Sequence, residues 1–161
     1  MNNLQSFLTI GGLLLLSLTS LRFNQAILET STTDVENKVY LTAFSLADDM
    51  IEEIKVKSFD ESTIQFPTTN TASLTPVADL GPESGETFSS YDDIDDFNGY
   101  TRAVNAPHAE GYSISCLVEY VDKDDPDDVS SDQTFYKRAK ITVTSPYMQH
   151  PVTLSFIFTL K

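Results

Sequence analysis

The sequence predicts an α+β fold in which one long N-terminal α-helix packs on a small C-terminal antiparallel β-sheet. Apolar residues dominate the first 24 positions, recur every three or four positions up to Lys57, and alternate with polar residues from Gly111 to the end. A period near 3.6 indicates a helix with one buried face, and a period of two indicates a half-buried strand. Because the chain has 161 residues and 40% hydrophobic content, it can bury one core of ordinary size.

Residues 1–24 form the most apolar segment, and three interpretations compete for it. A secretory signal peptide has a basic start and a small-residue cleavage site, but no Lys or Arg precedes Phe7 and no clear A-x-A pattern follows. A membrane anchor needs about 20 apolar residues, which the segment nearly supplies. The third interpretation is a helix that buries the same side chains against copies of itself, as a filament core. The candidate assembly or membrane residues are Phe7, Leu8, Ile10, Leu13, Leu14, Leu15, Leu16, Leu18 and Leu21.

Residues 25–57 continue this helix and begin the globular domain that we expect over 25–161. The segment contains neither Pro nor Gly, so nothing in it interrupts a helix. Its carboxylates, Asp48, Asp49, Glu52 and Glu53, fall opposite the apolar positions and are expected to be solvated. The apolar stripe consists of Val39, Ala43, Leu46, Ala47, Met50 and Ile54.

Residues 58–110 are expected to form an irregular connection between helix and sheet. The stretch is rich in Pro, Gly, Ser, Thr and Asp and shows no sustained period, which is typical of loops. Isolated apolar side chains are expected to pin it to the domain. These are Ile64, Phe66, Leu74, Leu80, Phe88, Tyr91 and Phe97.

Residues 111–161 predict three antiparallel strands with one buried and one wet face. The segments "YSISCLVEYV", "FYKRAKITVTS" and "VTLSFIFTL" alternate apolar and polar residues and are joined by short connections, as in antiparallel sheets. The stripe from Val39 to Ile54 is expected to cover the apolar face. The buried-face residues are Tyr112, Ile114, Cys116, Val118, Tyr120, Phe135, Ala139, Ile141, Val143, Val152, Leu154, Phe156, Phe158 and Leu160.

Charge and cysteine content exclude several classes of function. A net charge of −14 would repel a phosphate backbone, so we expect no nucleic-acid partner. Cys116 is the one cysteine; it cannot form a disulfide within the chain, and its place in an apolar alternation predicts a small buried side chain. Neither histidine lies in a nucleophile motif. We therefore expect no catalytic residues and no enzymatic activity.

The acidic stretch "YDDIDDFNGY" is the candidate metal site. Oxygen-rich clusters of this kind suit Ca²⁺, although the order of residues does not match an EF-hand loop. The alternative is a turn with solvated carboxylates, in which Gly99 supplies a positive φ. A second stretch, "VDKDDPDDVSSD", is expected to be an exposed hairpin tip. The candidate Ca²⁺ ligands are Asp92, Asp93, Asp95, Asp96 and Asn98.

The chain resembles the type IV pilin and pseudopilin superfamily, in its minor-pilin-like branch. The resemblance rests on the apolar N-terminus that continues into an amphipathic helix, and on "SLADDMIEEIKVKSFDE", "YDDIDDFNGY", "YSISCLVEYVD" and "YKRAKITVTSP". It implies subunits anchored in the inner membrane that pilus or secretion machinery extracts and stacks into an extracellular helical filament on the cell surface. Gln5 stands where pilins usually carry Glu, and the disulfide of many pilins is absent.

Three functions follow as expectations from these observations. The first is a structural subunit of a type IV pilus-like filament, a homo-oligomer built through its N-terminal helices. The second is a minor pilin or pseudopilin that primes or caps a pilus or a type II secretion machine. The third is a membrane-anchored Ca²⁺-binding module that does not polymerise. No cofactor is required, and Ca²⁺ is a possible ligand.

Overall fold

The computed structural model describes residues 3–106 and 109–160, and the order of elements is the expected helix, connection and sheet. The helix is α1 (Asn3–Lys55). The strands are β1 (Thr101–Ala106), β2 (Ala109–Tyr120), β3 (Tyr136–Thr144) and β4 (Val152–Thr159). The chain divides into two compact units, residues 1–38 and 39–161, which are described separately.

The first unit is helical throughout its described residues. Gly11 and Gly12 each cost about 1 kcal/mol relative to Ala in a helix, and the sequence marks them as the weakest point. Nevertheless α1 runs through both without interruption. The four leucines that follow the glycines, at positions 13–16, are good helix formers and favour the helix there.

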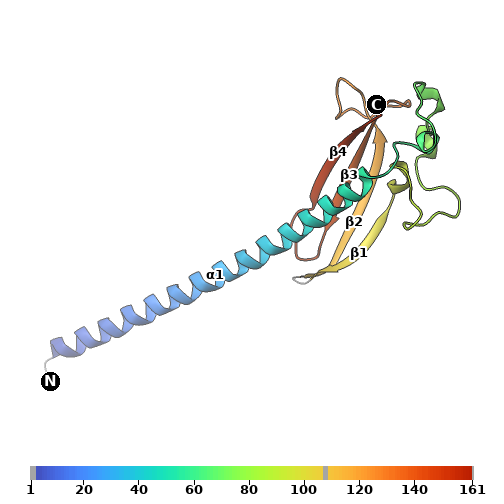
Figure 1. Ribbon diagram of the computed structural model, residues 1–161. Helices are drawn as coiled ribbons and strands as arrows, with labels where there is room; N and C mark the ends of the chain where they lie inside the picture. Colours follow the sequence, from blue (N-terminus) through green and yellow to red (C-terminus); the bar gives the residue numbers. More distant parts are fainter. Residues whose placement is uncertain (1–2, 107–108, 161) are drawn as a thin grey trace. The chain divides into compact units, whose positions relative to one another are not determined.

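The second unit contains a four-stranded antiparallel sheet in the order β1-β2-β3-β4, so each strand pairs with the next along the chain (Figure 1). The register places Cys116 of β2 opposite Ile141 of β3, and Ala139 of β3 opposite Phe156 of β4. Alternating burial along β2 from Tyr112 onward and along β3 gives the sheet its apolar face. The half-buried strands that the period of two predicted are confirmed.

Strand β1 was not predicted. It lies inside the segment 58–110 that was expected to be irregular, and β2 begins at Ala109 instead of Gly111. As an edge strand, β1 pairs only with β2, and its residues are exposed or half-buried. An edge strand with no buried face leaves no alternation in the sequence, which is why the pattern concealed it.

The C-terminal turns of α1 cover the apolar face of the sheet, as expected (Figure 1). The buried helix residues are Val39, Ala43, Ala47, Met50, Ile51 and Ile54. They share one core with the inward side chains of β2 and β3. The Tyr112 hydroxyl donates to the Val39 carbonyl at 3.2 Å, so a buried hydrogen bond joins the centre of the sheet to the helix.

An aromatic cluster holds the connection between α1 and β1. The rings of Phe88, Tyr91, Phe97 and Tyr100 lie 4.8–6.3 Å apart, mostly edge to face. This geometry favours aromatic pairs. Leu74 is also buried, and Leu80 is half-buried against the core.

The prediction that Ile64 and Phe66 anchor the connection is wrong. Phe66 is 74% exposed and Ile64 is 36% exposed, because both follow the turn Glu61–Thr63 on the outside of the domain. In β4, the expectation that Phe156 is buried also fails, since this edge-strand side chain remains 36% exposed. The Lys55 ammonium lies 4.4 Å from the centroid of the Phe156 ring and covers part of it.

Candidate functional site

The first unit presents an uncovered apolar surface on every side of α1. All nine assembly residues predicted between Phe7 and Leu21 are exposed by 56–74%. Within the described part of this unit, only Gly11 and Glu36 are even half-buried. Soluble monomers rarely expose an apolar area of this size, which marks a membrane or protein contact.

The apolar surface extends further along α1 than the sequence predicted. Together with the nine predicted residues, the exposed side chains of Leu4, Phe23, Ile27, Leu28 and Val35 define what we call the apolar helix surface. The prediction stopped at Leu21 because Arg22 interrupts the apolar run there. The helix also contains an 18-residue window with a mean hydropathy of 1.6, so it is long and apolar enough to cross a membrane.

The threonine hydroxyls of this unit donate to carbonyl groups of the helix itself. Thr9 donates to the Gln5 carbonyl at 3.1 Å, Thr19 to the Leu15 carbonyl at 3.0 Å, and Thr30 to the Ala26 carbonyl at 2.9 Å. A hydroxyl that is buried without a partner costs free energy. Because these hydroxyls already have acceptors, lipid or a protein core can surround them at little cost.

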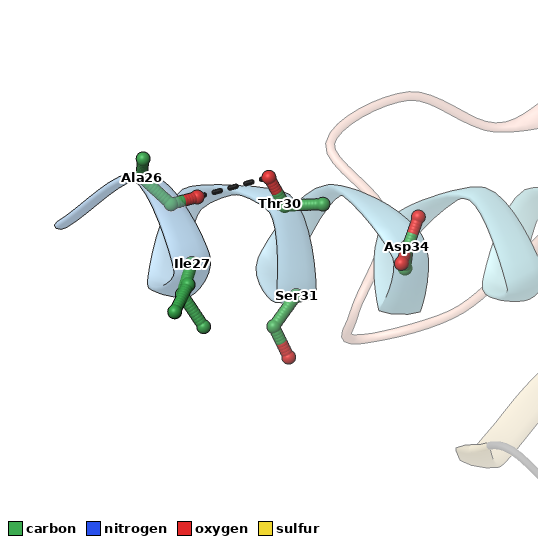
Figure 2. A pocket seen from close by; sticks show the side chains of 5 residues that line it. All are labelled: Ala26, Ile27, Thr30, Ser31 and Asp34. Carbon is green, nitrogen blue, oxygen red and sulfur yellow. Dashed lines mark hydrogen bonds between the residues drawn. The ribbon is translucent and has the colours of Figure 1, made fainter. Parts of the chain in front are cut away.

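A shallow hollow lies on the surface of α1 near the end of this unit (Figure 2). Three of its five lining residues, Ala26, Thr30 and Ser31, have small side chains. Small residues let a neighbouring helix approach closely. The residues shown are Ala26, Ile27, Thr30, Ser31 and Asp34.

The candidate Ca²⁺ ligands lie in the second unit, and the structure separates their roles. Asp93, Asp95 and Asp96 are each only 1% exposed, whereas Asp92 is exposed. The alternative of a solvated turn is therefore wrong for these three carboxylates. Asn98 bridges two backbone segments, since its Nδ2 donates to the Leu80 carbonyl at 2.9 Å and its Oδ1 accepts from the Val118 N–H at 3.0 Å. Gly99 follows with the expected positive φ of 75°.

A buried lysine meets this acidic segment. Lys137 of β3 is fully buried, and its Nζ donates to the Asp60 Oδ2 at 2.8 Å, to the Phe59 carbonyl at 2.9 Å, and to the Asp95 Oδ1. The rings of Phe59 and Tyr120 lie within 4.8 and 5.1 Å of the same ammonium. Lys137, Asp60 and Asp95 constitute what we call the buried ionic cluster.

Asp60 is the best-satisfied member of the cluster. Besides Lys137, its Oδ2 accepts from the Thr75 N–H at 3.0 Å, and the Tyr120 hydroxyl lies 3.1 Å away; its Oδ1 accepts from the Ser62 hydroxyl at 2.7 Å. Burial alone would raise the pKa of Asp60, but the hydrogen bond and charge of Lys137 overcome it and lower that pKa to about 2. The carboxylate therefore stays ionised.

The pKa of Asp93 shifts in the opposite direction. Burial first, and then the charges of Asp95 and Asp96, raise the pKa of its carboxyl to about 9. Two carboxyl groups that share a site cannot both ionise easily. Burial and these neighbouring charges therefore favour the protonated form of Asp93 over its ionised form.

Asp95 was predicted from the sequence as a site residue, whereas Asp60 and Lys137 were not. The sequence did indicate that Lys137 faces inward. Ala139, Ile141 and Val143 are the inward-facing positions of this strand, and the same period of two includes position 137. A lysine at an inward position needs a carboxylate partner. Nothing in the sequence shows which of the many acidic residues supplies it.

Two further predictions, the burial of Cys116 and the exposed hairpin tip, are confirmed. Cys116 is buried, as expected. The acidic side chains between β2 and β3 are exposed, as expected for a hairpin tip, and Arg138 pairs with Asp127.

The buried ionic cluster offers no open route to a substrate, since its three side chains are at most 1% exposed. Its arrangement joins the end of α1, the acidic segment and β3.

No protein-family model matches the chain, and no curated protein and no solved structure matches it. The architecture of a long apolar helix packed on a small antiparallel sheet is compatible with a pilin-like subunit.

Proposed function

We propose that the chain is a structural subunit of an extracellular type IV pilus-like filament and polymerises through its N-terminal helix. The observation that carries this proposal is the apolar helix surface, whose large side chains have no cover within their own unit. The same surface would anchor the subunit in the inner membrane before assembly. Pilus or secretion machinery would then move it into the filament, and no catalytic activity is involved.

The energetics of transfer support this proposal. Burying one Leu, Ile or Phe side chain contributes about 1.5–3 kcal/mol, so the fourteen side chains of the apolar helix surface stabilise burial in lipid or in a protein core. Moving them from lipid to a core of equivalent helices changes their environment little. A contact of this type that does not close into a ring propagates as a filament.

The helix also carries exposed apolar side chains in the second unit. Leu41 is 67% exposed and Phe44 is 49% exposed, although the neighbouring residues Val39 and Ala43 are fully buried in the core. Leu41 and Phe44 lie outside the membrane-length segment and outside the core. They therefore provide a test of assembly that leaves both the anchor and the fold intact.

The experiment is electron microscopy of the purified full-length protein and of the double variant Leu41→Ser, Phe44→Ser. We expect filaments from the native chain, and a large loss of filaments from the variant with unchanged circular dichroism. The matched control is Asp48→Ser, Asp49→Ser, which alters exposed positions on the same helix and should still polymerise.

Other outcomes would assign a different function. Filaments that contain this chain only at one end would indicate a priming or capping subunit. A native protein that stays monomeric in detergent and on membranes would contradict the proposal and favour a membrane-anchored module.

A further inference from the structure

The starting observation is a set of buried carboxylate oxygens without donors. Among the described residues, Asp93 Oδ2, Asp95 Oδ2 and Asp96 Oδ1 are buried and have no hydrogen-bond partner. Buried polar atoms without partners are rare and require an explanation. Of these three residues, Asp96 is the one whose carboxylate also lies close to two glutamates.

Asp96 is held rigidly by its other oxygen. Its Oδ2 accepts from the backbone N–H groups of Asp92 and Asp93, at 2.9 and 3.1 Å. These bonds fix the carboxylate at the start of the short turn Asp95–Phe97. Lys137, the buried cation of this region, is already engaged by Asp60 and Asp95, so it does not neutralise Asp96.

Two glutamates complete a group of carboxylates around Asp96. Glu83, Glu86 and Asp96 each offer an oxygen, and these three oxygens lie within 4.8 Å of one another. A tight turn brings the glutamates together, since the Glu86 N–H donates to the Glu83 carbonyl at 3.0 Å and Gly85 has the positive φ of 95° that such a turn requires. Like charges placed this close repel each other unless something lies between them.

The surrounding contacts hold the glutamate turn against Asp96. On one side, the Asn98 side chain binds the Leu80 carbonyl. On the other side, the Phe88 ring stacks on Tyr100 at 4.8 Å. The turn is thus tethered at both ends to the segment that carries Asp96.

We propose that Glu83, Glu86 and Asp96 bind one divalent cation, with Ca²⁺ the best fit. All three ligands are carboxylates. Carboxylates bind hard cations in preference to the softer transition metals. Ca²⁺ binds oxygen at about 2.3–2.6 Å and accepts irregular sets of about six to eight ligands, including water. Oxygens up to about 5 Å apart can therefore contact the same ion, which the observed spacing satisfies. Of the five ligands predicted from sequence, this site uses only Asp96.

The cation would fasten the connection between α1 and β1. It would join the glutamate turn to the acidic segment between Tyr91 and Phe97 of the aromatic cluster, in a region with little regular structure. An ion that binds only the folded form raises the stability of that form. The alternative occupant is a proton shared among the three carboxyl groups, and the experiment distinguishes the two.

The experiment measures Ca²⁺ binding to the full-length protein in detergent after treatment with chelator. Calorimetric titration with CaCl₂ should show one bound ion per chain, and Ca²⁺ should raise the melting temperature by several degrees. Tb³⁺, which substitutes for Ca²⁺ in oxygen sites, should emit on excitation of the nearby Tyr91. MgCl₂ should give a smaller thermal shift.

The decisive variant is Glu83→Gln, Glu86→Gln, which should abolish the thermal shift and the Tb³⁺ emission. Because Glu83 is exposed and Glu86 is half-buried, this variant should fold, as far-ultraviolet circular dichroism in chelator would verify. The matched control Asp124→Asn, Asp125→Asn removes the same charge from the exposed hairpin tip and should bind Ca²⁺ like the native chain. Absence of binding at millimolar Ca²⁺, or equal loss of binding in both variants, would overturn the proposal.

Discussion

Lys137 and Asp60 are separated by 77 positions in the sequence, yet the Lys137 Nζ lies 2.8 Å from the Asp60 Oδ2 with both side chains fully buried. Asp60 follows the end of α1, and Lys137 lies near the start of β3. Asp95 binds the same ammonium from the acidic segment. One cation thus holds together three parts of the second unit, two of which are also joined by the backbone bridge between Ser58 and Asp93.

Replacing Lys137 with Met should destabilise the second unit by about 3 kcal/mol or more. The substitution leaves Asp60 and Asp95 buried without their cation, and removal of one partner from a buried ion pair has a cost of this order. Urea unfolding followed by circular dichroism measures the loss. Lys140→Met is the control, because Lys140 is an exposed lysine on the same strand, and it should change stability little. Equal stability of the two variants would contradict a role for the cluster.

Acid should weaken the same cluster. The folded-state pKa of Asp60 is about 2, below its ordinary value of 3.8. The carboxylate therefore contributes stability that is fully present above pH 3.8 and is lost as the pH falls towards 2. In Asp60→Asn, the decline of unfolding free energy over this window should be shallower than in the native chain. Parallel declines in the two proteins would assign the acid sensitivity to other groups.

The sequence was sufficient to predict those parts of the fold that have a strong period. The stripe from Val39 to Ile54 and the alternation along β2 follow directly from burial on one face, and both are present in the structure. Strand β1 could not be found in this way, because an edge strand with exposed residues has no such pattern. Local periodicity therefore predicts the central elements of the domain better than its edge strand β1.

The candidate sites were predictable only in part, for a different reason. A run of aspartates has the same sequence whether it is solvated or folded inward onto a lysine. Asp95 and Lys137 are 42 positions apart, and the glutamate turn lies outside the motif that suggested a metal. Such groups are assembled by tertiary contacts, which a local pattern does not contain. The apolar helix surface, in contrast, is contiguous in the sequence and was largely predicted.

A charge at Ile54 should unfold the second unit. Ile54 lies on the face of α1 that packs on the sheet and is fully buried. Ile54→Asp therefore places a carboxylate in the core without a partner, at a cost of several kcal/mol. The thermal midpoint should fall by many degrees, or the protein should fail to fold. The control Val56→Asp lies two residues further on, where the side chain is 80% exposed. A midpoint for Ile54→Asp within a degree or two of the native value would contradict the packing described.

Cys116 should be unreactive in the folded protein and reactive in the unfolded one. Its side chain is 3% exposed, and burial raises the pKa of its thiol to about 12. Because the thiolate is the reactive form, an aromatic disulfide reagent at neutral pH should modify the native chain only through opening of the domain. In concentrated urea the same reagent should react at once. Lys137→Met, which is expected to open more often, should react faster than the native protein, whereas Lys140→Met should not. Rapid and complete modification of the native chain would instead place Cys116 at an accessible surface and contradict the burial of β2.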